Sequence, residues 1–478
     1  MKKEGTTLRR EAAAPELLLR LDRNASEPLR AQLEQELRAA IRAGRLKARA
    51  PLPSTRALAQ DLGLSRGIVV DAYEQLLAEG YLVARQGSAT TVAEGRVIDE
   101  PAARTPTRAA APAVGEQLRY DFRPGVPDTS TFPRREWHRS LRNVLAKSTA
   151  ETMGYLEPRG SRAARVAVSA YVNRARGTSA QPEHMVICNG FTQGFRLACT
   201  VLRRMGIEAV ATEDPSHDEQ REAVRDAGLD CVTVPVDAGG LIVERLERSH
   251  ARAVLVTPAH QFPTGAVLAP QRRAALLDWA ARKEAFVIED DYDAEFRYDR
   301  EPIGALQGVA PDRVIYIGSA SKILAPALRL GWLVAPPALV PAFVRVKEIE
   351  DRGSANLEQL AFADFIERGA LDRHLRRMRR IYRQRHDALT AALQKHLPKR
   401  RVSGIAAGLH FMLELPPGAE ESEVIAKARE LSVNAYGTER YRGRARLPPA
   451  LILGYGVLRD SAVAEGVRRL ASVVEKRR

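Results

Sequence analysis

The first ninety residues carry apolar periods typical of short amphipathic helices. Between residues 26 and 44 a leucine or isoleucine recurs at every fourth position and Gly44 ends the pattern, which predicts a helix with Ser26 as its N-cap. A second helical pattern begins after Ser54 and stops at Gly63. The four residues "GLSR", from Gly63 to Arg66, predict a tight turn before the next helical pattern.

A third helix and a strand pair complete this region. Ser65 is a candidate N-cap, and the apolar positions behind it share one face until Gly80. Residues 81–92 alternate around a Gln-Gly-Ser reversal, which predicts two short strands joined by a basic turn. Three helices followed by such a wing predict a winged helix-turn-helix, whose third helix enters the major groove of DNA. The residues expected at the DNA are Arg56, Ser65, Arg66, Arg85 and Gly87.

The pattern changes twice after this predicted first domain of residues 1–93. Residues 94–118 are rich in Ala and Pro and have no apolar period, which predicts a flexible linker. In residues 119–478, seven short apolar runs such as "AVLVTP" and "AFVIED" are separated by helical patterns. Such runs are typical of a mostly parallel sheet covered on both faces. We therefore expect a multidomain protein whose second domain has a large α/β part, at about 119–345, and a smaller α+β part, at about 346–478.

Charge and composition narrow the class of partner. The formal net charge of +15 indicates a polyanionic partner. Seven arginines lie between Arg373 and Arg385, and this run is interpreted either as a solvated helix face or as a surface that follows a nucleic-acid backbone. Three cysteines, at positions 188, 199 and 231, lack metal-ligand spacing and are expected to be reduced structural thiols, so no metal is predicted.

No stretch of the chain predicts an association with membranes. None approaches the roughly 18 apolar residues of a membrane helix, and the opening residues lack the apolar centre of a secretion signal. We expect a cytoplasmic protein.

Chemically active side chains follow several of the predicted strands. Ligands of parallel α/β sheets bind beyond the carboxyl ends of the strands. "VICNGFTQG" leads from a strand into a helix whose first amides can hold a phosphate. "VIEDDYD" ends a strand with a run of carboxylates and Tyr292, and Lys322 follows the strand "VIYIG". Each feature also has a structural interpretation, as a turn cap, an ion pair or a solvated lysine. Together they supply what pyridoxal phosphate requires, namely an amine, a carboxylate for the ring nitrogen, a phenol and phosphate anchors.

At this point the sequence resembles a known family. Residues 119–478 resemble fold-type I aminotransferases, and the chain from about Glu27 onward is similar to the MocR subfamily of GntR-type transcriptional regulators. The matching motifs include "LPSTRALAQDLGLSR", "DFRPGVPDTSTFP", "GYLEPRG", "TPAHQFPTG", "IEDDYDAEFRY" and "SKILAPALRLG".

The resemblance implies roles for the residues of these motifs. Lys322 would bind pyridoxal 5'-phosphate as the internal aldimine, Asp290 would pair with the ring nitrogen, and Tyr292 would bond to the ring hydroxyl. The phosphate would be surrounded by Phe191, Thr192, Ser319, Ser321 and Arg329. In such enzymes the tyrosine of a motif like "GYLEPRG" reaches the phosphate of the other subunit, so Tyr155 implies a homodimer with head-to-tail aminotransferase-type contacts.

Three positions depart from the aminotransferase pattern. His217 stands where a tyrosine or tryptophan usually stacks on the cofactor ring, and Phe262 replaces the asparagine of "NPTG". Ile452 occupies the position of the arginine that grips the substrate carboxylate. An aliphatic side chain supplies none of the charge-assisted hydrogen bonds that a carboxylate needs, each of about 1.5–3 kcal/mol, so ordinary transamination is doubtful.

Two functions therefore stay open. The first is a transcriptional regulator that senses pyridoxal phosphate, or its adduct with a small amine or amino acid, to control genes of vitamin B6 or amine metabolism. Its DNA partner would be an operator of direct or inverted half-sites. The second is a working aminotransferase with an attached DNA-binding module. The sequence favours the first.

Overall fold

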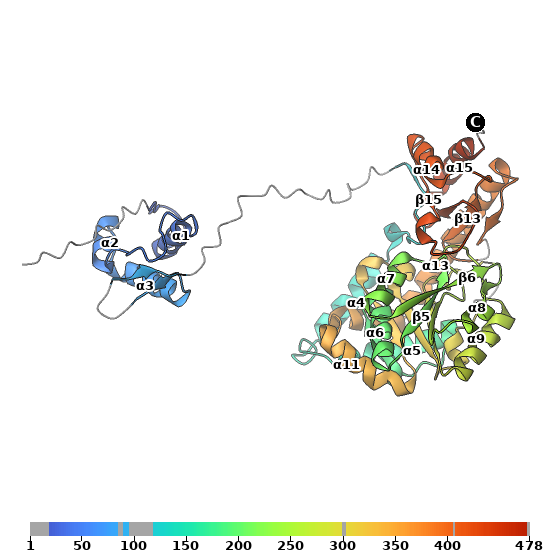
Figure 1. The fold of residues 1–478 in the computed structure, drawn as a ribbon, viewed down its shortest axis with the longest axis horizontal. Coiled ribbons are helices and arrows are strands. Elements are labelled where there is room, and N and C mark those ends of the chain that lie inside the picture. The colour runs from blue at the N-terminus through green and yellow to red at the C-terminus, as the bar shows by residue number, and fades with distance from the viewer. Residues whose placement is uncertain (1–18, 85–88, 95–117, 299–302, 405–406, 476–478) are drawn as a thin grey trace, which may run out of the picture. The chain divides into compact units, whose positions relative to one another are not determined.

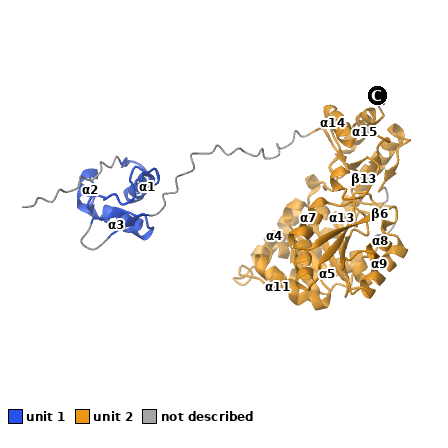
Figure 2. Cartoon of the chain, in the orientation of Figure 1, with its two compact units in different colours: residues 1–114 blue, residues 115–478 orange. Residues whose placement is uncertain are grey.

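The protein contains two compact units, residues 1–114 and 115–478 (Figure 2). The structure, a computed structural model, describes residues 19–84, 89–94, 118–298, 303–404 and 407–475. The predicted linker falls almost entirely outside these ranges, as do Arg85 and Gly87 of the predicted wing. Within the described ranges, no helix combines the length and the apolar character needed to cross a membrane.

The first unit is the predicted winged helix-turn-helix. Its elements are α1 (Leu29–Arg42), α2 (Thr55–Leu62), α3 (Arg66–Ala78), β1 (Leu82–Val83) and β2 (Thr91–Val92), the two strands being antiparallel. The apolar periods form one core, in which Leu33, Leu37 and Leu76 are fully buried. Burial of each such side chain contributes on the order of 2 kcal/mol, so the helical periodicity of the sequence is what assembles this unit.

The helix starts differ from the prediction in two places. Pro28, not Ser26, occupies the N-cap of α1, because its backbone is extended (φ −57°, ψ 137°) and the helix begins only at Leu29; the Ser26 prediction was wrong. Ser54 caps α2 by accepting a hydrogen bond from the Ala57 amide at 3.2 Å. Ser65 stands at the N-cap of α3, but its side chain makes no capping hydrogen bond, so its hydroxyl stays exposed.

The second unit is built on an eight-stranded, mostly parallel sheet (Figure 1). The strands lie in the order β4-β11-β10-β9-β8-β5-β6-β7. Their bounds are β4 Met185–Cys188, β5 Ala209–Asp214, β6 Asp230–Asp237, β7 Gly240–Leu241, β8 Ala253–Val256, β9 Phe286–Asp291, β10 Val314–Ser319 and β11 Gly331–Val334. Each of the seven predicted runs is a strand. β11 is antiparallel to both neighbours, so β4, β9 and β10 point the same way.

Helices cover both faces of this sheet. One face packs against α6, α7 and α11, and the other against α8 and α9. The helices of this part are α4 (Arg134–Lys147), α5 (Arg162–Arg176), α6 (Phe191–Arg204), α7 (Asp218–Asp226), α8 (Val243–Glu247), α9 (Pro270–Arg282), α10 (Ala320–Ile323), α11 (Val340–Asp351) and α12 (Asn356–Glu367). Coverage on both sides explains why the strands read as continuous apolar runs.

The C-terminal part is a smaller α+β assembly. Its antiparallel sheet has the order β12-β13-β16-β15. Its elements are α13 (Ala370–His396), β12 (Val402–Ser403), β13 (His410–Glu414), α14 (Glu421–Glu430), β14 (Val433–Asn434), β15 (Tyr436–Gly437), β16 (Ala450–Gly454) and α15 (Asp460–Val474). The early strand β3 (Tyr120–Asp121) pairs with β14. The predicted division near residue 345 stays a prediction, but the start of the unit is hydrogen-bonded to its C-terminal part.

Candidate functional site

Three parallel strands deliver the predicted site residues to one edge of the sheet. β4 leads into the Asn189-Gly190 turn, β9 ends at Asp291, and β10 ends at Ser319. Lys322 lies in the short helix α10 directly behind β10. The strand ends therefore bring together segments that are more than 130 residues apart in the chain.

The acidic run at the end of β9 is divided between the two faces of the strand. Asp291 accepts hydrogen bonds from the Arg176 guanidinium at 2.7 Å and the Tyr316 hydroxyl at 2.6 Å. Glu289 accepts the amides of Leu306 and Gln307. Successive side chains of a strand point to opposite faces, so Asp290 alone of the three carboxylates faces the Lys322 side.

Asp290 is a buried acid that lacks a hydrogen-bond donor among the described residues. Burial, with the nearby Asp291 and Asp293 carboxylates, raises its pKa well above the ordinary value, while Lys322 opposes this. A cationic or N–H-bearing ligand group beside Asp290 would relieve this cost, because buried carboxylates are stable only when paired or hydrogen-bonded.

The Lys322 amine faces the carboxylates from the other side of the site. Burial lowers its pKa, and Asp293 and Asp290 act in the opposite direction. The loop behind β3 covers the amine: a Cβ atom added at Gly125 would lie 3.8 Å from Nζ. A partly buried lysine with a lowered pKa is neutral more often and is therefore more nucleophilic.

A hydrogen-bonded group that the sequence analysis did not predict holds Tyr292. The Tyr292 hydroxyl donates to the His260 carbonyl at 2.8 Å and lies 3.1 Å from His260 Nδ1. The same nitrogen lies 3.1 Å from Asp293 Oδ2, and both side chains are buried. His410 lies beside this group, and the ligand atoms of His260, Asp293 and His410 are all within 4.8 Å of one another. These residues come from separate segments, and no spacing in the sequence relates them.

An aromatic cluster forms a wall of the site beside Tyr292, whose ring packs against it. The His217 ring stacks on Phe262 with centroids 4.1 Å apart and planes inclined by 6°. Tyr441 meets both rings edge-on, and Ile452, fully buried, packs into the same cluster. Burial, together with the Lys322 charge, lowers the pKa of His217 to about 4. The ring is therefore neutral near pH 7 and can stack as an uncharged aromatic group.

The predicted phosphate anchors surround the start of α6. Gly190 has a φ of 87°, and a Cβ there would lie 3.3 Å from Arg329 Nη2. The Arg329 guanidinium donates to the Asn189 carbonyl at 2.6 Å. Phe191 and Thr192 provide the first amides of α6, which have no partner within a helix. Ser319 accepts from the Ser321 amide at 3.4 Å. This is the chemistry of an anion site at a helix N-terminus.

A buried lysine braces this turn from behind. Lys347 is completely buried, and its amine donates to both Asp351 oxygens, at 2.6 and 2.7 Å. Asp351 in turn accepts from Gln193 at 2.7 Å, and Gln193 accepts the Asn189 amide at 2.8 Å. The only trace of this brace in the sequence is a Lys and an Asp four residues apart on one helix.

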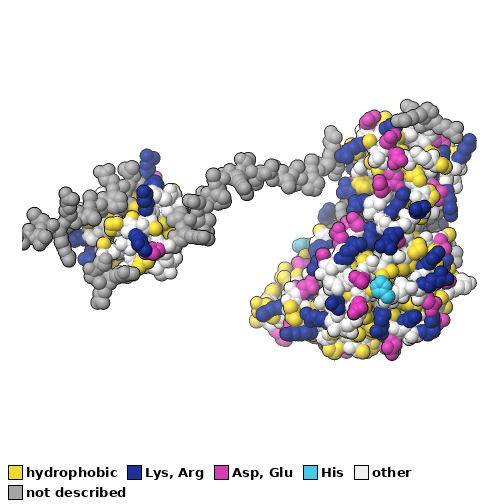
Figure 3. Space-filling model, viewed as in Figure 1, with side chains coloured by type: hydrophobic (Ala, Val, Ile, Leu, Met, Phe, Trp, Pro, Cys, Tyr) yellow, Lys and Arg dark blue, Asp and Glu magenta, His cyan; other side chains and the backbone are white. Residues whose placement is uncertain are grey.

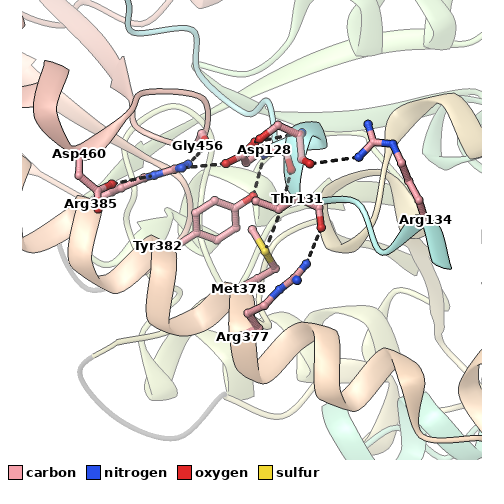
Figure 4. Close-up of polar contacts among 10 residues, drawn as sticks. Asp128, Thr131, Arg134, Arg377, Met378, Tyr382, Arg385, Gly456 and Asp460 are labelled. Atoms are coloured by element: carbon pink, nitrogen blue, oxygen red, sulfur yellow. Dashed lines mark hydrogen bonds and ion pairs between the residues drawn. The ribbon is translucent and has the colours of Figure 1, made fainter. Parts of the chain in front are cut away.

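The arginine-rich helix α13 fastens the loop behind β3 (Figure 4). Arg385 binds the Asp128 carboxylate at 2.7 Å, Asp460 at 3.2 Å and the Gly456 carbonyl. Arg377 donates to the Thr131 carbonyl. Part of the run thus binds the protein itself, an arrangement absent from both sequence interpretations. The exposed arginines of the run are Arg373, Arg376, Arg377, Arg380 and Arg383.

Tyr155 lies apart from this cluster within its own chain. Its side chain is 89% exposed, and the nearest charged group described at the ring is the Arg352 guanidinium, 5.9 Å from the centroid. Met153 and Ile349 are also exposed apolar side chains. A tyrosine that is almost fully exposed is typical of a protein contact surface.

In the first unit, the predicted DNA-contacting residues lie at two helix starts. Arg56 is in the first turn of α2, and Arg66 opens α3 directly after Ser65. All three side chains are exposed, and neither arginine makes a hydrogen bond or ion pair to another described residue. Their role at DNA stays a prediction.

Comparison with known proteins accounts for both units. The profile of "Bacterial regulatory proteins, gntR family" matches residues 29–92, and "Aminotransferase class I and II" matches residues 125–447. The chain is 34% identical to the probable rhizopine catabolism regulatory protein MocR of Rhizobium meliloti, over 95% of both chains. It is 32% identical to the pyridoxine biosynthesis transcriptional regulator PdxR of Corynebacterium glutamicum, over 91% of this chain and 93% of that one. The chain belongs to the MocR subfamily of GntR-type regulators.

The fold of this MocR-type chain also matches solved enzymes. An archaeal alanine:glyoxylate aminotransferase superposes with a TM-score of 0.70 at 24% identity, covering 76% of this chain and 92% of that one. The α-aminoadipate aminotransferase LysN of Thermus thermophilus gives a TM-score of 0.67 at 26% identity, covering 75% and 92%. The predicted fold class is confirmed. The chain is a DNA-binding transcriptional regulator with an aminotransferase-like body, and pyridoxal phosphate is the cofactor of that body.

The residues at the strand ends fit this cofactor. Among the residues that the structure describes, the buried Asp290 carboxylate lacks a donor where a protonated ring nitrogen would supply one. The Lys322 amine faces it, and helix amides with an arginine form an anion cradle. What the sequence analysis missed is the supporting layer, made by His260, Asp293, His410, Lys347 and Arg385.

Proposed function

We propose that the body of this MocR-type regulator senses its cofactor instead of turning over a substrate. The observation that carries this proposal is the packing of Phe262 against Ile452 in a buried apolar cluster. These are the positions at which the family resemblance expects an asparagine and a carboxylate-binding arginine. An apolar wall offers an amino-acid carboxylate no charged partner, and such a charge left unpaired there costs several kcal/mol.

Each polar residue at the strand ends has a proposed part in holding the cofactor. When bound, pyridoxal phosphate supplies an aldehyde and an electron-withdrawing ring. Lys322 provides the neutral amine that attaches it, favoured by the lowered pKa of this side chain. Asp290 accepts a hydrogen bond from the protonated ring nitrogen. The Tyr292 oxygen hydrogen-bonds to the ring hydroxyl as an acceptor, since its own proton is donated to the His260 carbonyl. His217 stacks on the ring as a neutral imidazole.

The phosphate is proposed to lie at the start of α6. There Phe191 and Thr192 offer backbone amides, and Ser319 and Ser321 offer hydroxyls. Arg329 supplies the countercharge, since it is already held beside the turn by its bond to the Asn189 carbonyl. Anchors fixed before binding lose little entropy when the ligand arrives.

The sensor is proposed to act as a homodimer. The exposed Tyr155 ring supports this, because the resemblance places this tyrosine at the phosphate of the partner subunit. Two subunits carry two DNA-binding heads, so an operator of two half-sites, direct or inverted, is the expected target. Because genomic DNA is that target, the proposed place of action is the cytoplasm.

The head is proposed to read DNA with the starts of two helices. Arg66 and Ser65 would lie at the major groove, and Arg56 would contact the backbone, as Arg85 and Gly87 would at the wing. Cofactor binding, alone or with a small amine or amino acid, changes operator affinity if the cofactor binds one arrangement of the heads more tightly than another.

Active transamination is the alternative function, and one arginine favours it. The Arg440 guanidinium lies 4.9 Å from the centre of the Tyr441 ring and pairs with Glu219 at 3.3 Å. If Arg440 released Glu219 and paired with a substrate carboxylate, it would take the role of the arginine whose position Ile452 occupies.

One pair of variants tests the sensor against the enzyme. Lys322→Ala should abolish the absorption band of the lysine-linked cofactor and the response of operator binding to added pyridoxal phosphate. The control Lys283→Ala removes an exposed lysine and should change neither. An unchanged band in Lys322→Ala would refute the site. Steady conversion of an amino donor and a keto acid by the unaltered protein would favour the enzyme.

A further inference from the structure

A second hollow of the body lies outside the cofactor site, beside β6 and α7. It is a groove of about 810 Å³, within the range of small-molecule sites. Its walls are the exposed side of β6, the helix α7 and the loop at residues 443–445. Figure 3 shows a band of Lys and Arg side chains across the visible face of this unit.

The charged side chains that line the groove differ in whether they are already hydrogen-bonded. Arg225 and Arg444 line it, and neither guanidinium makes a hydrogen bond or ion pair with another described residue. Asp214 also lines it, but its carboxylate accepts the backbone amides of residues 443, 444 and 445, at 2.6 to 2.8 Å. The Asp214 carboxylate is therefore consumed in shaping the wall. Of the other charged groups, Asp230 lies beside His250 at 3.7 Å, while Arg225 and Arg444 stay available for an anion.

The remaining lining is mixed, with Asp230, Thr233 and His250 as its polar members. The Asp230 carboxylate lies 3.7 Å from His250 Nε2, and both side chains are largely exposed. Leu229 and Pro235 contribute apolar surface to the floor, and the half-buried Cys231 also lines it. We propose that this groove is a second ligand site of the regulator, which binds a small organic anion with an apolar part. The anion pairs with Arg225 and Arg444, and the apolar part covers the floor.

A buried arginine joins this groove to the cofactor site. Arg221 lines the groove, and its guanidinium donates to the carbonyls of Ser216 and Tyr441, at 3.0 and 3.2 Å. The Ser216 amide donates to the same Tyr441 carbonyl at 3.0 Å. Ser216 precedes His217, whose ring contacts Tyr441 edge-on. A ligand that shifts Arg221 therefore displaces two side chains of the aromatic wall, and by linkage the cofactor changes the affinity for that ligand.

Protection of Cys231 reports on the groove directly. Burial raises the pKa of this thiol, so alkylation of the full chain is run at alkaline pH; the thiols of Cys188 and Cys199 are more deeply buried, with pKa values of about 12. Phenylacetate is the probe. Acetate has the same charge without the ring, and benzyl alcohol has the ring without the charge. Phenylacetate should slow the alkylation of Cys231 at concentrations where the other two do not.

Matched arginine variants identify the anion contact. Arg225→Ala and Arg444→Ala should each weaken protection by phenylacetate roughly tenfold, the loss of one charge-assisted hydrogen bond. Arg204→Ala, an exposed arginine on α6 outside the groove, should not weaken it. The anion site would be overturned if phenylacetate protected Cys231 equally in all variants, or if benzyl alcohol protected it as well as phenylacetate does.

The link to the cofactor is measured separately. Phenylacetate affinity should differ between the chain loaded with pyridoxal phosphate and the chain freed of it, and the absorption band of the loaded chain should shift. An identical affinity and band would overturn the link. Because Cys231 is also measured in the cofactor-free chain, the second site is tested even if Lys322 holds no cofactor.

Discussion

The two units place their functional charges in opposite environments. In the head, Arg56 and Arg66 are exposed and make no described pairing. In the body, burial is the largest influence on the pKa values of Asp290 and Lys322, each of the two also acts on the other, and the buried Asp293 lies 3.1 Å from His260 Nδ1. Exposed charged side chains suit the binding of a hydrated polyanion such as DNA. A ligand that is held by directed hydrogen bonds requires a site from which water is largely excluded.

This difference predicts which substitutions destabilise each unit. An exposed arginine of the head that pairs with no buried group, such as Arg66, can be removed without disturbing the apolar cluster that forms its core. In the body the same kind of change leaves a partner charge buried without compensation. The following variants test this contrast within each unit.

The largest effect is expected at the ion pair beneath the cofactor site. Arg176→Met leaves Asp291 buried without its cation, which should lower the free energy of unfolding of the body by about 3–5 kcal/mol. Arg174→Met removes a 60% exposed arginine from the same helix, and the change should stay within about 0.5 kcal/mol. All three tryptophans lie in the body, so their fluorescence in urea reports its unfolding. Equal losses in the two variants would contradict the contrast.

The next effect is expected at the DNA-facing helix of the head. Arg66→Ala should weaken operator binding by about 1–3 kcal/mol if the side chain reaches a base or phosphate, with no change in the cofactor spectrum. Arg30→Ala on α1, where the side chain pairs with Glu34, is the matched control. Fluorescence anisotropy on a labelled operator measures both variants, and equal affinity would remove Arg66 from the interface.

A third effect concerns the pH dependence of the body. Burial raises the pKa of Glu213 to about 7, against hydrogen bonds from Thr257, so between pH 4.5 and 7 the folded body holds a proton that the unfolded chain has lost. The free energy of unfolding therefore falls as pH rises through this window. Glu213→Gln should reduce that slope by up to one proton, about 1.4 kcal/mol per pH unit. Urea midpoints at several pH values test this, and an unchanged slope would show that Glu213 is ionised throughout.

The smallest effect is expected at a helix cap. Ser54→Ala removes the hydrogen bond to the Ala57 amide and should destabilise the head by about 1 kcal/mol. Ser65→Ala removes a hydroxyl that makes no capping bond and should leave the stability of the head unchanged. Hydrogen exchange of peptides from α2 and α3 in the full chain distinguishes the two. Similar losses would mean that Ser65 caps α3 in solution.

Much of the architecture could be predicted because it follows from local patterns. The helices of the head and the seven strands of the body came from apolar periodicity, which burial on one or both faces enforces. The positions of Asp290 and Lys322 at strand ends followed from the parallel sheet alone. Ser26 was misplaced as a cap because Pro28 adopts an extended ψ of 137° and the helix begins one residue later. The proline ring fixes φ alone, which suits a cap and a first helical residue equally, so composition does not decide between them.

The rest of the site could not be predicted because it depends on contacts between distant segments. His260, Asp293 and His410 meet only after the C-terminal sheet packs on the body. The arginine-rich run offered two interpretations, yet Arg385 binds three groups in two other segments of the same chain, Asp128 in one and Gly456 and Asp460 in the other. Side chains with several available partners are assigned by tertiary structure, not by spacing.

The pairing of β3 with β14 sets the order in which the molecule is completed during synthesis. Tyr120 is opposite Val433, so the ribosome must make more than 300 further residues before this pair can form. The head closes on contacts within its own short segment and needs none of them. A chain released early would therefore keep its DNA-binding head and lack the sensor, and in a cell it would compete for operators without responding to the cofactor.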